Sequence, residues 1–151
     1  MRKLILILTL ILSSCYSSQE IISKTYKLNE DITFELKKYE EYTNDSGYIR
    51  SEDAIYVQIK LILNNKSAKK QTVDFKNYFL INERNEKIPL WKAQYKIEPM
   101  QTEKTIAVVE PYSKESVYIK FVAPKNSKNT HLVTEAETIK LEFGETKSKV
   151  F

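Results

Sequence analysis

Between Tyr26 and Phe143, apolar residues recur at every second position in four separate stretches. A period of two is typical of strands that bury one face, so these stretches predict half-buried β-strands. The clearest strand has all of its apolar residues on one parity, with Gln58 and Lys60 on the other. Its apolar residues are Ile55, Val57, Ile59, Leu61 and Leu63. The other stretches are Ile32, Phe34 and Leu36; Val117, Ile119 and Phe121; and Ile139, Leu141 and Phe143.

Short polar segments separate these predicted strands. Residues 64–67 (Asn-Asn-Lys-Ser) and 83–86 (Glu-Arg-Asn-Glu) have the composition of tight turns between antiparallel strands. Pro89 cannot donate a ladder hydrogen bond, so we expect residues 88–91 to lie on a sheet edge. A short helical turn is expected within residues 126–137.

Two shorter runs, residues 79–81 and 106–109, are apolar on both parities, which favours central strands. No stretch of twelve residues after the first fifteen has a clear helical period. The pattern therefore predicts an all-β fold, an antiparallel β-sandwich of about seven or eight strands.

The amino terminus has a different pattern. Arg2 and Lys3 precede an unbroken apolar run over residues 4–12, followed by Ser13, Ser14 and Cys15. This arrangement is typical of an export signal, and the run is shorter than the roughly 20 residues that span a membrane. Residues 12–15 (Leu-Ser-Ser-Cys) resemble the lipobox of bacterial lipoproteins. The resemblance implies removal of residues 1–14 and lipidation, with palmitate or a similar acyl chain, of Cys15.

Two points about the anchor stay open. A conventional signal peptide cut near Ser14 would leave Cys15, the sole cysteine, as a free thiol in an oxidising compartment. In lipoproteins, Asp after the lipidated cysteine favours retention at the inner membrane. Tyr16 occupies that position here, which favours the outer membrane within the cell envelope. The side of the membrane that the protein faces is undecided.

The remaining chain has the size of one domain. We expect a tether over residues 15–24, a sandwich over residues 25–146 and a tail over residues 147–151. Loss of Arg2 and Lys3 with the signal reduces the formal net charge from +4 to +2. Charges of both signs are interspersed along the rest of the chain, so we predict no nucleic-acid surface.

Several segments together resemble a telokin-like immunoglobulin-fold domain, a kind of domain found in bacterial lipoproteins and largely of unknown function. These segments are residues 55–90, residues 109–114 (Val-Glu-Pro-Tyr-Ser-Lys) and residues 117–124 (Val-Tyr-Ile-Lys-Phe-Val-Ala-Pro). The resemblance implies an immunoglobulin-like sandwich and supplies no catalytic residues. The sequence departs from the pattern at Tyr112 and Asn85, which stand where the turns usually have glycine.

Catalytic chemistry has little support in the sequence. The sole histidine, His131, lies in a polar connection, and no Gly-x-Ser-x-Gly motif provides a nucleophile. A zinc site needs three or four suitable ligands, which one histidine makes improbable. We therefore predict that the protein is not an enzyme and has no metal site and no cofactor. A pair of carboxylates suited to hydrolysis stays open as an alternative.

Residues 39–53, between two predicted strands, are rich in tyrosine and acidic residues. We predict that Tyr39, Tyr42 and Tyr48 form a partner-binding loop, because loop tyrosines supply contact area at low entropic cost. The alternative is that these tyrosines close the end of the core while the acids keep the loop solvated. The acids do not have EF-hand spacing, so calcium is only weakly indicated. Trp91 is a further candidate anchor, with core packing against Phe79 or Tyr95 as its alternative.

Two function classes follow from these features. The first is a lipid-anchored interaction module of the cell envelope, held to the membrane through Cys15, that binds a protein or polymer through sandwich loops or an edge strand. The second is an inhibitor of an envelope hydrolase or, with less support, a small carboxylate-dependent hydrolase. The sequence does not identify the partner.

Overall fold

A computed structural model describes residues 16–22, 24–45, 48–49, 52–95 and 105–144 of the chain. The export signal, Cys15 and the tail after Gly144 lie outside the described residues. Within these ranges all regular structure is β, in thirteen strands. They are β1 (Tyr16–Glu20), β2 (Thr25–Lys27), β3 (Ile32–Tyr42), β4 (Asn44–Asp45), β5 (Tyr48–Ile49), β6 (Ala54–Asn65), β7 (Gln71–Asp74), β8 (Phe79–Asn82), β9 (Lys87–Tyr95), β10 (Ile106–Val109), β11 (Lys114–Pro124), β12 (Asn129–Val133) and β13 (Thr138–Lys140).

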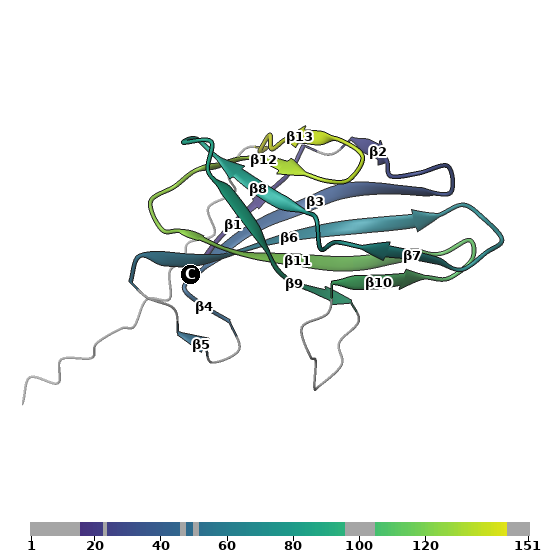
Figure 1. Ribbon diagram of the computed structural model, residues 1–151, viewed down its shortest axis with the longest axis horizontal. Coiled ribbons are helices and arrows are strands. Elements are labelled where there is room, and N and C mark those ends of the chain that lie inside the picture. The colour runs from purple at the N-terminus through teal and green to yellow at the C-terminus, as the bar shows by residue number, and fades with distance from the viewer. Residues whose placement is uncertain (1–15, 23, 46–47, 50–51, 96–104, 145–151) are drawn as a thin grey trace, which may run out of the picture.

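The strands form an antiparallel sandwich, as the sequence predicts. One sheet has the order β1-β3-β6-β11-β9-β8-β12-β13, with β2 also paired to β3. Two two-stranded pairs, β10 with β7 and β4 with β5, complete the fold. Figure 1 shows the long strands β3, β6 and β11 side by side, with β8, β12 and β13 above them. The strand number exceeds the expected seven or eight because several short strands have no strong periodic signal.

The core lies on the inner face of the long strands β3, β6 and β11, the face turned toward β8, β12 and β13. Every odd-numbered residue from Ile55 to Leu63 of β6 is buried there, as are Val117, Ile119 and Phe121 of β11. Register pairs Ile59 with Ile119 and Val57 with Phe121, so the apolar parities of the two strands coincide. The period-two pattern therefore predicted this part of the core correctly.

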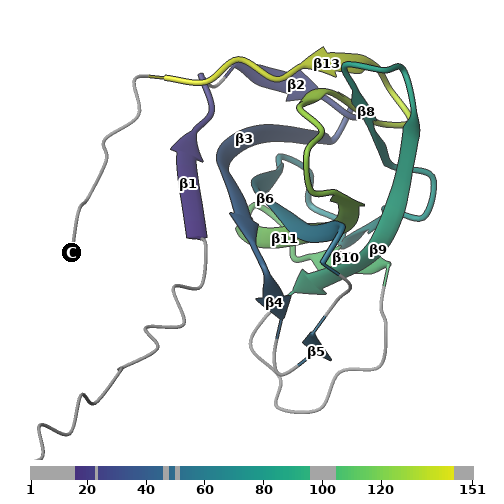
Figure 2. The same ribbon diagram turned by 90° about the vertical axis from the view of Figure 1, so that its left-hand side faces the viewer.

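The sheet edges meet near the amino terminus of the described chain. Ile21 forms an isolated antiparallel bridge with Phe143. On either side of it, the Ile22 N–H donates to the Glu142 carbonyl at 2.8 Å, and the Gly144 N–H donates to the Glu20 carbonyl at 3.0 Å. Figure 2 shows the chain after β13 running across to the end of β1. The predicted tether over residues 15–24 is thus wrong for its described part, because β1 pairs with β3.

One further expectation is corrected, and another is met in part. The expected helical turn within residues 126–137 is strand β12, which pairs with both β8 and β13. The expected edge position around Pro89 holds on one side: within β9, Lys87–Pro89 pair with β8, and the pairing with β11 begins at Leu90. On the β8 side, the Leu90 N–H donates to the Tyr78 carbonyl at 3.2 Å. Hydrogen-bonded pairs alternate along an antiparallel ladder, so Pro89 opposite Phe79 faces no ladder acceptor.

The two turns that lack the usual glycine keep the backbone shape that glycine favours. Asn85 has φ of 59° and Tyr112 has φ of 52°. Asparagine adopts this left-handed region readily, whereas an aromatic residue does so at some cost in free energy. Both departures from the telokin-like pattern are therefore accommodated by the backbone.

Candidate functional site

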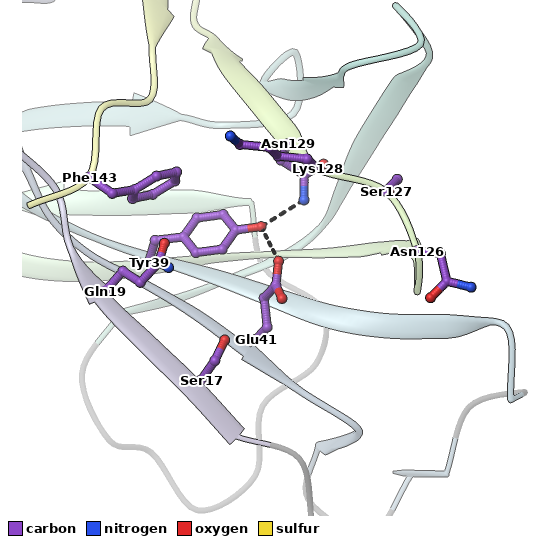
Figure 3. Close-up of a pocket in the computed structure, with 9 residues that line it drawn as sticks. All are labelled: Ser17, Gln19, Tyr39, Glu41, Asn126, Ser127, Lys128, Asn129 and Phe143. Atoms are coloured by element: carbon purple, nitrogen blue, oxygen red, sulfur yellow. Dashed lines mark hydrogen bonds between the residues drawn. The ribbon is translucent and has the colours of Figure 1, made fainter. Parts of the chain in front are cut away.

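A pocket of about 450 Å³ lies beside the edge strand β1. Figure 3 shows its walls: Ser17 and Gln19 from β1, Tyr39 and Glu41 from β3, residues 126–129, and Phe143. Opposite pairs in the β1–β3 ladder, Ser17 with Glu41 and Gln19 with Tyr39, place these four side chains on the same face. The segment that leads into β12 forms the facing wall.

Three polar side chains are joined at the wall of this pocket. The Tyr39 hydroxyl donates to Glu41 Oε1 at 2.6 Å and accepts a hydrogen bond from Asn129 Nδ2 at 2.7 Å. Tyr39 is 4% exposed and Asn129 is 2% exposed. The Tyr39 ring also packs edge-on against Phe143, with 5.1 Å between ring centroids. Tyr39 is thus fixed by both its hydroxyl and its ring.

One buried atom of this group has no partner. Asn129 Oδ1 accepts no hydrogen bond from any described residue. Buried polar atoms nearly always have a partner, and leaving one unpaired costs roughly 1–3 kcal/mol. The amide orientation is fixed by Tyr39, because a reversed amide would compete with Glu41 for the single hydroxyl proton. Asn129 Oδ1 is therefore an unsatisfied acceptor that is closed off from solvent.

The surroundings of the Tyr39 hydroxyl keep it protonated. Burial, with the nearby Glu41 charge and hydrogen bond, raises the pKa of Tyr39 far above its ordinary value. The hydroxyl therefore keeps its proton over the whole physiological range. Its single proton is donated to Glu41.

On the outer face of β3, the face turned away from the core, Glu40 is fully engaged. Its carboxylate accepts hydrogen bonds from the Tyr16 hydroxyl at 2.5 Å and from Gln58 Nε2 at 2.7 Å, and it pairs with Lys38. Burial alone would raise the pKa of Glu40, but these three partners outweigh it and lower the pKa. The Glu40 hydrogen bond and charge in turn raise the pKa of Lys38. This cluster joins β1, β3 and β6.

The predicted partner-binding tyrosines are not gathered in one loop. Tyr39 and Tyr42 both lie in β3, so the loop interpretation is wrong for these two residues. Tyr39 faces the core, which agrees with the alternative that it closes the core. Tyr42 stacks on Tyr56 of β6 at 5.6 Å between centroids. The backbone of Tyr48 lies in β5, but its side chain lies outside the described residues.

Trp91 belongs to the same aromatic group as Tyr42. Its ring lies 5.1 Å from the ring of Tyr56, which is 0% exposed although it points away from the core. Lys92 Nζ lies 3.9 Å from the Trp91 ring centroid. Trp91 therefore packs, with Tyr42 and Tyr56, in an aromatic row that crosses β3, β6 and β9.

Other candidate chemistry finds no assembled site in the described ranges. His131 lies in β12, between Ile81 and Lys140, and its ring Nδ1 lies 2.9 Å from Thr130 Oγ1. Across the part of the chain that the structure describes, no group of three or more His, Cys, Asp or Glu side chains could hold a metal ion. The same part contains no helix long and apolar enough to cross a membrane.

The sequence did not indicate Asn129, Glu41 or Phe143 as site residues. Asn129 and Tyr39 are 90 positions apart, and no local pattern shows that they meet. Glu41 was one of several acids in a tyrosine-rich segment. The only available signal was Tyr39 itself, which was proposed as a binding residue for a different reason.

The fold is similar to a solved structure described as an uncharacterized β-sandwich protein from Clostridium difficile 630. The match has a TM-score of 0.53 with 10% sequence identity, and it covers 76% of this chain and 86% of that chain. No protein-family model matches the chain, and no curated protein matches it. At this identity the similarity concerns the fold alone, and it supports a β-sandwich domain.

Proposed function

We propose that the protein is a lipid-anchored binding module of the bacterial cell envelope, and that the pocket beside β1 holds a polar group of a protein or polymer partner. The single observation that carries the binding role is the pocket itself, which Ser17, Gln19 and Glu41 line with polar side chains. A partner that donates a hydrogen bond to the Glu41 carboxylate gains a charge-assisted contact there. The pocket also lies between an edge strand and a connecting segment, which are common places for binding groups.

The position of the pocket agrees with an anchor at Cys15. Ser17, which lines the pocket, is two residues from Cys15, and two residues span at most about 7 Å. Because β1 starts at Tyr16 and pairs along its whole length with β3, lipidated Cys15 would hold the sandwich without an intervening tether. In this arrangement the pocket opens close to the membrane surface.

The immunoglobulin-like character is part of the same proposal. It is supported by the pairing of β6 with β11 and by the left-handed backbone at Asn85 and Tyr112, where the telokin-like pattern places glycine. That pattern occurs in bacterial lipoproteins, which agrees with the lipobox over residues 12–15.

The anchor is tested by the substitution Cys15→Ala. We expect the parent to incorporate labelled fatty acid and to partition into detergent, and the variant to do neither. A parent that takes up no label, with a variant that partitions equally, would show that a conventional signal peptide precedes an unmodified cysteine.

The binding role is tested by affinity capture from detergent-solubilised envelopes. The full-length protein should retain a stoichiometric partner, and Glu41→Gln, which removes the carboxylate charge from the pocket, should lose it. Glu52→Gln, the same change at an exposed position outside the pocket, is the matched control and should retain the partner. Equal capture by all three proteins would exclude the pocket, and capture of an inactivated hydrolase would favour the inhibitor alternative.

A further inference from the structure

Strand β1 lies at the edge of the sheet, and half of its backbone groups face away from β3. Among the described strands, β1 pairs with β3 alone. The Ile21 N–H donates to the Lys37 carbonyl at 3.2 Å in the continuation of this ladder. Hydrogen-bonded pairs alternate in an antiparallel ladder, so the odd-numbered residues of β1 turn their N–H and C=O groups toward β3. The even-numbered residues therefore turn these groups outward; they are Tyr16, Ser18 and Glu20.

The outward edge of β1 is already paired at one end. Residues 142–144 run antiparallel to residues 20–22. The Gly144 N–H donates to the outward-facing Glu20 carbonyl at 3.0 Å. The chain that follows Gly144 therefore starts at the open edge of β1, in the antiparallel direction. Residues 145–151, which lie outside the described residues, are long enough to cover this edge, because β1 has five residues.

The composition of β1 does not protect its open edge. Natural sheets protect an edge strand with proline, lysine or a β-bulge, or they cover it with another segment. β1 has the sequence Tyr-Ser-Ser-Gln-Glu, and its ladder with β3 has no register shift. Residues 145–151 (Glu-Thr-Lys-Ser-Lys-Val-Phe) contain neither proline nor glycine, so they can pair as a strand. Cover by this segment is the remaining means of protection.

We infer that residues 145–148 dock antiparallel on the open edge of β1 and bring the Lys147 ammonium to the Glu41 carboxylate in the pocket. The register of the pairing with residues 20–22 sets Lys147 opposite Ser17, which is itself opposite Glu41. Directly opposite residues share a face of the sheet, so all three side chains lie on the pocket face shown in Figure 3. Neighbouring strands are about 4.8 Å apart, so the backbones of the two charged residues are about 10 Å apart, which their side chains together can span.

The charge of Glu41 complements that of the docked segment. Its carboxylate accepts a hydrogen bond from the Tyr39 hydroxyl, and no ion pair joins it to a cation in the described part of the chain. The Lys147 ammonium supplies a charge-assisted contact. Residues 145–148 thereby occupy part of the pocket of their own domain, so a partner that bonds to Glu41 must displace them. Docking on β1 goes beyond the proposed binding role and does not depend on it.

Hydrogen exchange measured by NMR on the detergent-solubilised full chain tests the pairing. The docked segment accepts the Ser18 N–H, whereas the Gln19 N–H faces β3. We expect removal of residues 145–151 to speed exchange of the Ser18 amide at least about tenfold and to leave the Gln19 amide, the internal control, unchanged. Lys147→Gln should speed Ser18 exchange about twofold, the size expected of an exposed ion pair. Lys149→Gln, the same change two residues later, should have no effect.

Disulfide formation tests the register. Ser17→Cys with Lys147→Cys places two thiols at a non-hydrogen-bonded pair, where Cα atoms are about 4.5 Å apart and a disulfide fits. Ser17→Cys with Thr146→Cys, shifted by one residue, places them on opposite faces and is the matched control. After mild oxidation, peptide mapping should find the first pair linked in most molecules and the control pair largely unlinked. Mapping also distinguishes these disulfides from any that involves Cys15.

The contrary outcomes are distinct. Equal Ser18 exchange with and without residues 145–151 would overturn the inference, and so would equal linking of the two cysteine pairs. Ser18 protection that survives the shortening but is lost on dilution would show that a second copy covers the edge, which also overturns it. An unchanged Ser18 exchange in Lys147→Gln would overturn the contact with Glu41. None of these measurements involves a partner, so their failure is distinguishable from a failure of the capture experiment.

Discussion

Two regions of the molecule each contain a buried asparagine, but only one region provides hydrogen-bond partners for the whole side-chain amide. Asn65, at the end of β6, is 1% exposed and uses its whole amide. Its Nδ2 donates to the carbonyls of Lys69, Val109 and Glu110 at 2.7–3.1 Å, and its Oδ1 accepts from the Ser67 N–H at 3.0 Å. Asn129, in the pocket wall, is equally buried but has an idle oxygen.

A third buried asparagine, Asn82, resembles Asn65 rather than Asn129, because its amide is also satisfied. Asn82 donates to Glu86 Oε2 at 2.6 Å and accepts from the N–H groups of Arg84 and Glu86, which closes the β8–β9 hairpin. Asn65 and Asn82 thus replace missing backbone partners at turns. The three asparagines are equally buried and differ only in how many of their amide atoms are satisfied.

The largest expected effect comes from removing a fully satisfied amide. Asn65→Ala leaves several buried carbonyls and an N–H without partners, each worth about 1–3 kcal/mol, so we expect a loss of about 3 kcal/mol in the free energy of unfolding. Urea denaturation followed by circular dichroism measures it. Asn64→Ala, one residue earlier, is the control and should change the value by less than about 0.5 kcal/mol. Similar losses at the two positions would contradict the structural role.

A smaller effect on stability is expected at Glu40, on the outer face of β3. Three partners lower the pKa of Glu40 from its ordinary value of 4.5, so its contribution to stability is present above pH 4.5 and is lost as the pH falls through the lower folded pKa. Glu40→Gln should therefore reduce stability at pH 7 and lessen the decline between pH 5 and pH 3. Urea unfolding at several pH values measures this slope. Glu52→Gln, at an exposed position, is the control, and an unchanged slope in Glu40→Gln would refute the prediction.

The smallest expected effect is at the pocket. Asn129→Leu loses one hydrogen bond to Tyr39, worth about 1 kcal/mol, but also removes the unsatisfied oxygen, so stability should change by less than about 1 kcal/mol. The same substitution at Asn82 leaves the N–H groups of Arg84 and Glu86 without their acceptor and should lower the free energy of unfolding by at least about 1 kcal/mol more. Thermal and urea unfolding of the pair give the comparison. If both variants lose equal stability, the Asn129 amide stabilises the fold as much as the fully satisfied Asn82 amide does, and the comparison fails.

The sequence by itself determined the strands with a strong period. One parity of apolar residues fixed which face of β6 and β11 is buried, because side chains alternate strictly along a strand. The hairpin tip at Asn85 was equally local, since a left-handed residue is a property of the turn. The lipobox prediction at Cys15 is also local, and it stays a prediction.

Only the tertiary structure decided the candidate site. In β3, the apolar parity of Ile32, Phe34 and Leu36 would turn Glu40 inward and Tyr39 outward. The register with β6 shifts between Leu36 and Lys38, where one extra residue forms a β-bulge. An extra residue reverses every later side chain, so Tyr39 reaches the core and meets Asn129. A bulge depends on the partner strand, and the partner of Tyr39 comes from 90 positions away, so no local pattern in the sequence contains either fact.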